Sequence, residues 1–363
     1  MTSFHRNPIE RILRIAVVAP VAQSVPPRKS GSIETVTSLL VDSLVEQGQT
    51  VTLFAAGSST TSAKLHATFE LGYHNDLSLW PWELCEQFNL AAAVERAADF
   101  DLIHAHAEFA PISLAYSRLS PVPIVHTIHH WPTPSEISLW RRYQESPFIA
   151  ISKAQAQQMK GLNIAGIVSH VVDTSILDFQ EEPGSYLLFI GRFTEGKGVI
   201  EAIDLARRSG IPLLLAAAEN KYYRETVSEH VDGKHVIFVG EVAPEAKAHL
   251  LGGARAILYP VQVPEPFGLV LAEAMACGTP VAALNRGAVS ELVEHGITGG
   301  VFDTVEQLSS ALSWIVTLDR KRIRERAVTR FSPHRMALSH IRIYDALVNH
   351  SGRNDHASSR NPL

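Results

Sequence analysis

Two glutamates stand eight positions apart in the segment EPFGLVLAEAMACGTPV, which begins at Glu265 and contains Glu273. A proline and a glycine directly after Glu265 predict a turn into a helix, and Gly278 predicts the end of that helix. Amides at a helix start lack partners within the helix and attract anions such as pyrophosphate. Here these amides belong to Phe267, Gly268 and Leu269. The spacing alone is also compatible with an ordinary amphipathic helix that has one capping and one exposed glutamate.

A second segment with candidate functional residues, GRFTEGKG (191–198), directly follows the apolar run YLLFI. Its cations, Arg192 and Lys197, could stabilise negative charge on a phosphate group without help from a metal. The order K-G, in place of G-K-[ST], excludes a nucleotide-hydrolysing P-loop. Taken alone, the two side chains could instead be solvated loop cations.

A glycine also interrupts the segment SGSIE (30–34), where Gly31 would let the backbone approach a ligand closely. The same residues suit a helix start, with Ser30 or Ser32 as the N-cap and Glu34 near the first turn. The two interpretations are compatible.

Histidines end two predicted strands of the first half. His129 and His130 close VHTIHH (125–130); a lone histidine beside a strand end is more often structural, but here there are two. His104 and His106 alternate along LIHAH, so they point to one face of a strand, as metal ligands would. No carboxylate or cysteine cluster completes a metal site around them, which favours a structural role.

The elements predicted to position these residues alternate between strands and helices. Buried strands are predicted at 14–20, 50–56, 100–106, 122–128 and 147–152, and then at 186–193, 212–218, 235–241, 255–261, 279–284 and 299–303. A helix is predicted over 33–48, ending at Gly48. The polar, turn-forming sequence around 171–185 indicates a linker. Near-continuous apolar strands predict parallel sheets, with ligands beyond the carboxyl ends of the strands.

Composition limits the classes of function. The 363 residues suggest two domains, and 46% hydrophobic with 19% charged residues is globular composition. A net charge of −5 offers no field for nucleic acid, so we expect no nucleic-acid partner. Cys85 and Cys277 are far apart in sequence, which favours a reducing cytoplasm. No long uncharged apolar run appears, so any membrane contact would be peripheral.

The glutamate segment and its continuation TPVAALNRGAVSELVEHGITGGVF resemble glycosyltransferase family 4, and GRFTEGKG resembles the G-R-x4-K-G element of that family. By this resemblance Glu265 would contact the hydroxyls of the donor sugar, Glu273 the nucleotide ribose, and the backbone at 267–269 the sugar and phosphate. Arg192 and Lys197 would bind the diphosphate, and Gly31 and His129 would reach the donor from the first domain.

The resemblance implies the GT-B fold, in which two Rossmann-like domains face each other. The domains implied are an extension at 1–13, an acceptor-binding domain at 14–172, a linker at 173–185, a nucleotide-sugar domain at 186–330, helices at 331–350 that return to the first domain, and a disordered tail at 351–363.

The activity implied is transfer of a hexose-type sugar from a UDP- or GDP-sugar to an acceptor hydroxyl, with retained anomeric configuration and a front-face mechanism. Neither a metal nor a cofactor is expected beside the nucleotide sugar. An epimerase or a disaccharide synthase of the same architecture, or a silent sugar-nucleotide sensor, are the alternatives. The acceptor could be a small molecule, a saccharide or a lipid-linked molecule.

Three features depart from the family. Ser32 stands where a second glycine is usual, HVVD (170–173) replaces an N-G-[VI]-D turn, and AENKYYRE (218–225) replaces a glycine-rich turn near the nucleotide. Trp131, Trp140, Arg141 and Arg142 could mark a surface for a lipid acceptor, although an ordinary amphipathic helix explains them as well. The sequence specifies neither the sugar nor the oligomeric state.

Overall fold

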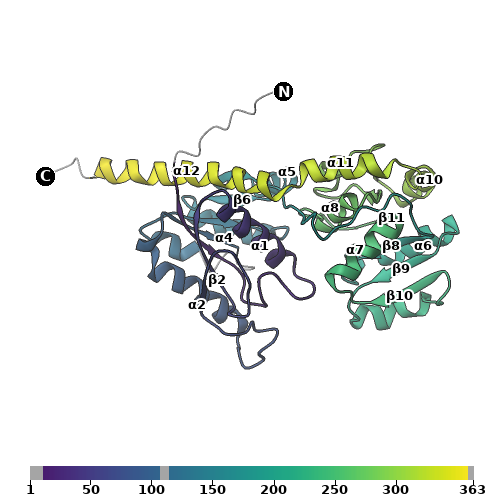
Figure 1. Ribbon diagram of the computed structural model, residues 1–363, viewed down its shortest axis with the longest axis horizontal. Coiled ribbons are helices and arrows are strands. Elements are labelled where there is room, and N and C mark those ends of the chain that lie inside the picture. The colour runs from purple at the N-terminus through teal and green to yellow at the C-terminus, as the bar shows by residue number, and fades with distance from the viewer. Residues whose placement is uncertain (1–10, 107–113, 359–363) are drawn as a thin grey trace.

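A computed structural model describes residues 11–106 and 114–358 of the chain. Two lobes lie side by side, the first built from the N-terminal half and the second from the following residues, and the last helix returns from the second lobe across the first (Figure 1). Each lobe contains one sheet whose strand pairs are all parallel. The predicted architecture of two Rossmann-like domains is confirmed.

The first sheet has seven strands in the order β3-β2-β1-β4-β5-β6-β7. Their bounds are Arg14–Val18 (β1), Thr50–Ala55 (β2), Lys64–Ala67 (β3), Leu102–Ala105 (β4), Ile124–Thr127 (β5), Phe148–Ala150 (β6) and Ile164–Ile167 (β7). The five predicted strands are present, whereas β3 and β7 were not predicted and form the two edges. The strand order reverses between β1 and β4, which opens a crevice at their carboxyl ends.

The second sheet has six strands in the order β10-β9-β8-β11-β12-β13, and all six were predicted. Their bounds are Tyr186–Ile190 (β8), Leu213–Ala216 (β9), Val236–Gly240 (β10), Ala254–Tyr259 (β11), Val281–Leu284 (β12) and Gly299–Phe302 (β13). Here the order reverses between β8 and β11. The loops that follow these two strands are therefore the expected ligand site of this lobe.

Helices cover both faces of each sheet. In the first lobe α1 (Ser32–Glu46) and α12 (Pro333–Ser358) pack on one face and α2 (Trp82–Glu95) on the other. In the second lobe one face carries α6 (Val199–Ser209) and α10 (Val305–Ile315), and the other carries α7 (Pro244–Gly253), α8 (Leu269–Ala276) and α11 (Arg320–Arg330). Three short α-helices also lie in the described part of the chain, namely α4 (Pro134–Trp140), α5 (Lys153–Gln158) and α9 (Val289–Leu292).

Helix α12 ties the end of the chain to the first lobe. Met336, Ala337, Ile341 and Tyr344 are buried in the same core as α1 and β1, as expected for a helix that crosses back. Residues 351–358 are helical, which corrects the tail predicted from residue 351. Extending an existing helix needs no new nucleus, so even a polar segment can continue it. Residues 359–363, and residues 1–10 of the predicted extension, lie outside the described residues.

Main-chain contacts join the lobes beside the linker, which has no helix or strand between β7 and β8. The Val172 amide donates to the Phe331 carbonyl at 3.2 Å. Across the same boundary the Glu291 carboxylate accepts from the amides of Lys153 and Ala154, at 2.9 and 2.6 Å. A carboxylate at the start of α5 is favoured by the helix dipole. Within the described ranges, none of the helices combines the length and apolar character that crossing a bilayer requires.

Candidate active site

The predicted site residues follow the strands at which the sheet order reverses. Arg192 and Lys197 lie in the loop after β8, and Glu265 lies in the loop after β11, the neighbouring strand. In the first lobe Gly31 follows β1 and His106 follows β4. In each lobe, two segments that are far apart in sequence therefore meet at the carboxyl ends of neighbouring strands.

Lys197 and Glu265 form an ion pair at the centre of the candidate site. The Lys197 ammonium lies 2.6 Å from the Glu265 carboxylate, which is only 7% exposed as a residue. The hydroxyl of Tyr259, at the end of β11, donates to the same carboxylate oxygen and lies 3.4 Å from the Lys197 ammonium. Burial, and then the charge of Glu265, raise the pKa of Tyr259 well above its ordinary value, so this phenol stays a donor. Tyr259 was not predicted.

Close backbone contacts set the position of Lys197. Gly198 has φ of 72°, and a Cβ there would lie 2.0 Å from the Pro260 carbonyl oxygen, so only glycine fits. The Gln262 amide donates to the Gly196 carbonyl at 2.9 Å. The loop after β8 is therefore fixed to the loop after β11.

A second glycine, which sequence reasoning missed, fixes Glu265. Gly287 has φ of 59°, and a Cβ there would lie 2.3 Å from the Glu265 carbonyl oxygen. That carbonyl accepts from the Ala288 amide at 2.8 Å. Because this contact spans more than twenty residues, no local pattern predicts it.

The helix predicted after Glu265 is α8, which starts at Leu269 with Gly268 as its N-cap and is followed by Gly278, as predicted. In the described part of the chain no acceptor is found for the amides of Phe267, Gly268 and Leu269. These amides remain able to bind an anion. The Phe267 side chain is buried and anchors the turn.

The other glutamate also pairs with a lysine. Glu273, on α8, lies 2.5 Å from the ammonium of Lys247 on α7, and Glu273 is 8% exposed. Lys247 was not predicted as a site residue, because it belongs to an unremarkable helix. Arg192 is different: it is exposed and has no ion-pair partner among the described residues. Its guanidinium is thus available to an anion.

Gly31 is the N-cap of α1, and no side chain caps that helix, which corrects the prediction of a serine cap. A Cβ at Gly31 would lie 2.4 Å from Gln23 Nε2 and 2.7 Å from Glu34 Oε2, which are the ends of flexible side chains that would have to move aside. Instead of capping, the Ser30 hydroxyl donates to Glu241 of the second lobe at 3.1 Å.

His129 is part of a cluster of histidines. Its Nε2 lies 3.1 Å from His106 Nδ1 and its Nδ1 lies 3.3 Å from His170 Nε2, so both ring nitrogens are occupied by histidines. The His170 ring lies 5.1 Å from the Phe267 ring, which connects the cluster to the start of α8. His130 instead pairs with Glu136 at 2.8 Å.

The histidine cluster is not arranged as a metal centre. Within the ranges that the structure describes, no group of three or more potential ligands is placed to hold a metal ion. His104 Nε2 lies 2.7 Å from Thr127 Oγ1 and its Nδ1 lies 2.6 Å from Tyr344 Oη. Burial lowers the pKa values of His104, His106 and His129 well below their ordinary value, so these rings are neutral at pH 7.

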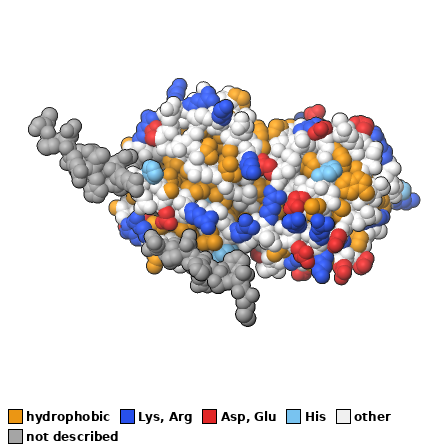
Figure 2. Space-filling view, turned by 90° about the horizontal axis from the view of Figure 1, so that it is seen from above, with side chains coloured by type: hydrophobic (Ala, Val, Ile, Leu, Met, Phe, Trp, Pro, Cys, Tyr) orange, Lys and Arg blue, Asp and Glu red, His pale blue; other side chains and the backbone are white. Residues whose placement is uncertain are grey.

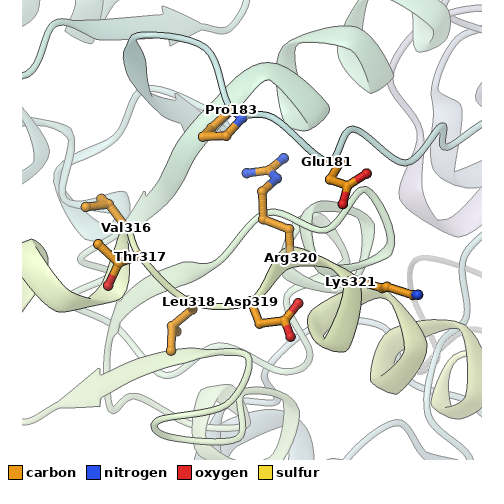
Figure 3. Close-up of a pocket in the computed structure, with 8 residues that line it drawn as sticks. All are labelled: Glu181, Pro183, Val316, Thr317, Leu318, Asp319, Arg320 and Lys321. Carbon is orange, nitrogen blue, oxygen red and sulfur yellow. The ribbon is translucent and has the colours of Figure 1, made fainter.

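A separate pocket of about 270 Å³ lies at the turn between α10 and α11 (Figure 3). Its lining consists of Glu181, Pro183, Val316, Thr317, Leu318, Asp319, Arg320 and Lys321. The Arg320 guanidinium donates to the carbonyls of Gln180 and Ala254 at 2.7 and 2.9 Å. Ala254 begins β11, so the pocket lies at the amino end of this sheet, whereas the candidate site lies at the carboxyl end.

One of the aromatic residues considered for a lipid surface is not available to it. Trp140 is fully buried and stacks on Phe148 with ring centroids 5.7 Å apart, so the interpretation as an ordinary amphipathic helix holds. Arg141 donates to the Lys160 carbonyl at 3.1 Å. On the face seen in Figure 2 basic and acidic side chains are interspersed over both lobes.

Two family models match consecutive parts of the chain. Residues 33–176 match the model described as Glycosyltransferase Family 4, and residues 178–330 match the model described as Glycosyl transferases group 1. The boundary between the matches falls in the linker. The chain belongs to glycosyltransferase family 4.

Curated relatives and solved structures resemble this chain over most of its length. A phosphatidyl-myo-inositol mannosyltransferase of Mycobacterium leprae is 25% identical over 93% of this chain and 97% of its own. AviGT4, a glycosyltransferase involved in avilamycin A biosynthesis, is 24% identical with a TM-score of 0.70, over 93% and 98% of the two chains. Anabaena HepE, solved in complex with UDP-glucose, is 19% identical with a TM-score of 0.68, over 93% and 100%. This family 4 chain is thus a glycosyltransferase of GT-B fold.

Proposed function

We propose that this chain transfers a hexose from a UDP- or GDP-sugar to an acceptor hydroxyl with retention of anomeric configuration. The observation that carries the proposal is the ion pair of Lys197 and Glu265, held by Tyr259 beside the amides that start α8. A cation, a carboxylate and free amides at one point match the diphosphate and hydroxyls of a nucleotide sugar. The structure of HepE with UDP-glucose and the name of the mannosyltransferase relative support this donor class.

In the proposed front-face reaction the acceptor hydroxyl attacks the anomeric carbon from the side of the leaving group. The bond between that carbon and the phosphate oxygen breaks, and the departing phosphate takes the proton of the hydroxyl. Arg192, Lys197 and the amides of α8 would stabilise the charge on the nucleoside diphosphate. Glu265 would orient the sugar, and Glu273 would bind the ribose. No metal and no cofactor enters this scheme.

The acceptor hydroxyl would enter from the first lobe, which carries Gly31 and His129. A small molecule, a saccharide or a lipid-linked molecule meets the chemical requirement, and the last would bring the chain to a membrane surface. We place the reaction in a reducing compartment such as the cytoplasm, since Cys85 and Cys277 are free, buried thiols.

The test is a panel of UDP- and GDP-sugars in a thermal-shift assay, followed by release of nucleoside diphosphate with candidate acceptors and determination of the product anomer. We expect one donor to stabilise the chain, and Lys197→Ala to lower kcat by about a hundredfold or more. Arg192→Ala should act in the same direction. Wild-type turnover in both variants would contradict the assignment. Sugar interconversion without an acceptor would instead indicate an epimerase.

A further inference from the structure

Exposed hydrophobic side chains gather in one segment of the first lobe, between the end of β3 and the middle of α2. Of the twelve large ones in the described part of the chain, five lie there and the other seven are spread along the rest. The five are Leu71, Leu77, Trp80, Leu84 and Phe88, with exposed fractions between 41% and 88%. Isolated exposed hydrophobic residues are ordinary, whereas a group of them indicates a binding surface. We call residues 71–88 the apolar segment.

Helix α2 directs large apolar side chains toward the solvent and uses polar ones to attach itself to the lobe. On its inner side Asn89 donates to two main-chain carbonyls at 3.0 and 3.1 Å, and the Glu86 carboxylate accepts from the Val21 amide at 3.0 Å. Leu84 and Phe88 are four positions apart, so they share the outer side of the helix, and both are exposed. A surface helix normally presents polar residues to water, because an exposed leucine or phenylalanine gains nothing there. The outer side of α2 therefore lacks an apolar partner within the described residues.

The loop before α2 is fixed to the loop after β1, at the carboxyl end of the first sheet. The amides of Tyr73 and His74 donate to two carbonyls of that loop, at 3.1 and 2.9 Å. A Cβ at Gly72 would lie 2.4 Å from the Ala22 carbonyl oxygen, so the two loops are in direct backbone contact. The loop after β1 continues to Gly31, and the residue before Gly31 bonds to the second lobe. The apolar segment thus begins beside the part of the first lobe that meets the second.

The charge of this region limits what can bind to it. Residues 65–95 contain no lysine or arginine but five acidic residues, namely Glu70, Asp76, Glu83, Glu86 and Glu95. Attraction to an anionic membrane surface or to a phosphate headgroup depends on lysine and arginine side chains next to the apolar ones. An uncharged apolar group therefore fits this surface, and an anionic one does not. In Figure 1 α2 lies on the side of the first lobe that faces away from α12.

We propose that the acceptor is an uncharged amphiphile, whose hydroxyl enters the candidate site and whose alkyl or aromatic part lies on the apolar segment. Leu77 and Trp80 would contact the part nearer the hydroxyl, and Leu84 and Phe88 the part farther from it. The new bond joins the anomeric carbon to the oxygen of that hydroxyl, and the proton leaves with the phosphate, as in the scheme above. This inference rests on the proposed function and names the class of its acceptor.

The first test is binding of alkyl β-glucosides from methyl to decyl, each below its micelle concentration, measured by titration calorimetry and tryptophan fluorescence. We expect the affinity to rise by up to about fourfold for each added CH₂ until the segment is covered. Trp80, which is 76% exposed, should shift its emission to shorter wavelength, and the variant Trp80→Phe identifies that contribution. An affinity that does not depend on alkyl length would overturn the inference.

The second test removes the outer side of α2 by the double substitution Leu84→Gln and Phe88→Gln. Both residues are exposed, so the melting temperature should stay near that of the wild type. We expect octyl β-glucoside to bind at least about tenfold more weakly, with no change for methyl β-glucoside or for the sugar nucleotide. The matched control is Leu139→Gln, on α4, where the leucine is 49% exposed and outside the segment. Equal affinities for octyl β-glucoside in the double variant and the wild type would overturn the inference.

Two other occupants of the apolar segment give different results. Sedimentation with phosphatidylcholine vesicles that the double variant loses, without affinity for monomeric glucosides, would show that the segment docks on a bilayer. A dimer in light scattering that the double variant converts to a monomer would show that a second copy of the chain covers it. Either result would overturn the assignment to the acceptor.

Donor binding distinguishes failure of this inference from failure of the proposed function. A wild-type chain that binds no UDP- or GDP-sugar would overturn both the proposed function and the acceptor role of the segment. A wild-type chain that binds the donor, and whose transfer to octyl β-glucoside is no faster than to methyl β-glucoside, would overturn the acceptor class alone.

Discussion

Tyr259 converts the ion pair of Lys197 and Glu265 into a fixed arrangement of three groups. Its hydroxyl donates to the carboxylate, and within the described residues it contacts only the side chains of Glu265 and Lys197. Removing a hydrogen bond to a charged group costs about 1.5 to 3 kcal/mol. We therefore expect Tyr259→Phe to lower kcat by about tenfold to a hundredfold with little change in melting temperature.

The matched control for Tyr259→Phe is Tyr186→Phe. Tyr186 lies in the same sheet, on β8, and its hydroxyl donates to the Leu250 carbonyl at 2.9 Å, away from the site. Steady-state transfer assays on both variants should show a loss for Tyr259→Phe alone. Equal activities would mean that the phenol does not orient Glu265 for turnover.

Lys247 is expected to act on nucleotide binding through Glu273. The ion pair at 2.5 Å holds a nearly buried carboxylate on α8, and loss of the ammonium would leave that carboxylate free to turn. If Glu273 binds the ribose, Lys247→Met should raise the KM of the donor by about tenfold and leave kcat near wild type. Arg208→Met removes an exposed pair with Asp204 at 3.3 Å on α6 and should change neither constant.

The buried histidines predict an acid-sensitive fold. Burial lowers the pKa of His170 and His126 to about 3 and that of His340 to about 4, against about 6.5 in an unfolded chain. Unfolding below pH 6.5 therefore takes up protons, so the stability present above that pH is lost as the pH falls toward 4. The free energy of unfolding should fall by up to about 1.4 kcal/mol per pH unit for each such histidine.

Denaturant unfolding between pH 7 and pH 4.5 measures this slope. His340→Gln removes one of the histidines and should make the slope shallower. A slope that is the same in the variant and in the wild type would show that His340 is not held neutral by the fold.

At the scale of elements, the loops after β8 and β11 are positioned by glycines that no side chain can replace. Gly287→Ala would push a Cβ to 2.3 Å from the Glu265 carbonyl oxygen, so Glu265 must move. Gly296 has a similar φ of 78°, but a Cβ there would meet nothing within 4 Å. We expect Gly296→Ala to cost only the left-handed backbone, about 1 to 2 kcal/mol, with transfer intact. Gly287→Ala should lose transfer by more than tenfold as well, in assays at a temperature where both variants are folded.

Most helices and strands could be predicted because the spacing of apolar residues follows which side chains are buried. Strands such as β8, buried in the middle of a sheet, read as continuous apolar runs. The edge strands β3 and β7 escaped prediction because KLHA is polar and IAGI contains a glycine, as partly exposed edges allow. The serine cap of α1 was predicted wrongly because Ser30 bonds to the other lobe, which local sequence cannot reveal.

The same limit applies to the candidate site. Glu265, Lys197 and the start of α8 belong to motifs whose spacing indicates chemistry, so they could be found in the sequence. Tyr259 and Gly287 act through contacts that only the fold creates. The contacts of His170 with His129 and Phe267 are likewise created by the fold, and no local pattern predicts them.

At the scale of the whole molecule, α12 makes the first lobe depend on the end of the chain (Figure 1). It follows α11 of the second lobe, yet Ile341 and Tyr344 are buried in the core of the first, and the Tyr344 hydroxyl contacts His104 at 2.6 Å. A disturbance of α12 should therefore reach the first lobe and the histidine cluster while leaving the second lobe, with Lys197 and Glu265, largely intact.

Ile341→Ala tests this separation. Truncating a buried isoleucine costs about 2 to 5 kcal/mol, so the melting temperature should fall, whereas Arg342→Ala, at an exposed position on the same helix, should change stability by less than about 0.5 kcal/mol. Because the second lobe is proposed to hold the nucleotide, titration calorimetry with the nucleoside diphosphate should give a near wild-type affinity for Ile341→Ala. Transfer should fall several-fold, since the reaction needs both lobes in register. A variant that loses nucleotide binding and turnover together would show instead that the two lobes form the nucleotide site jointly.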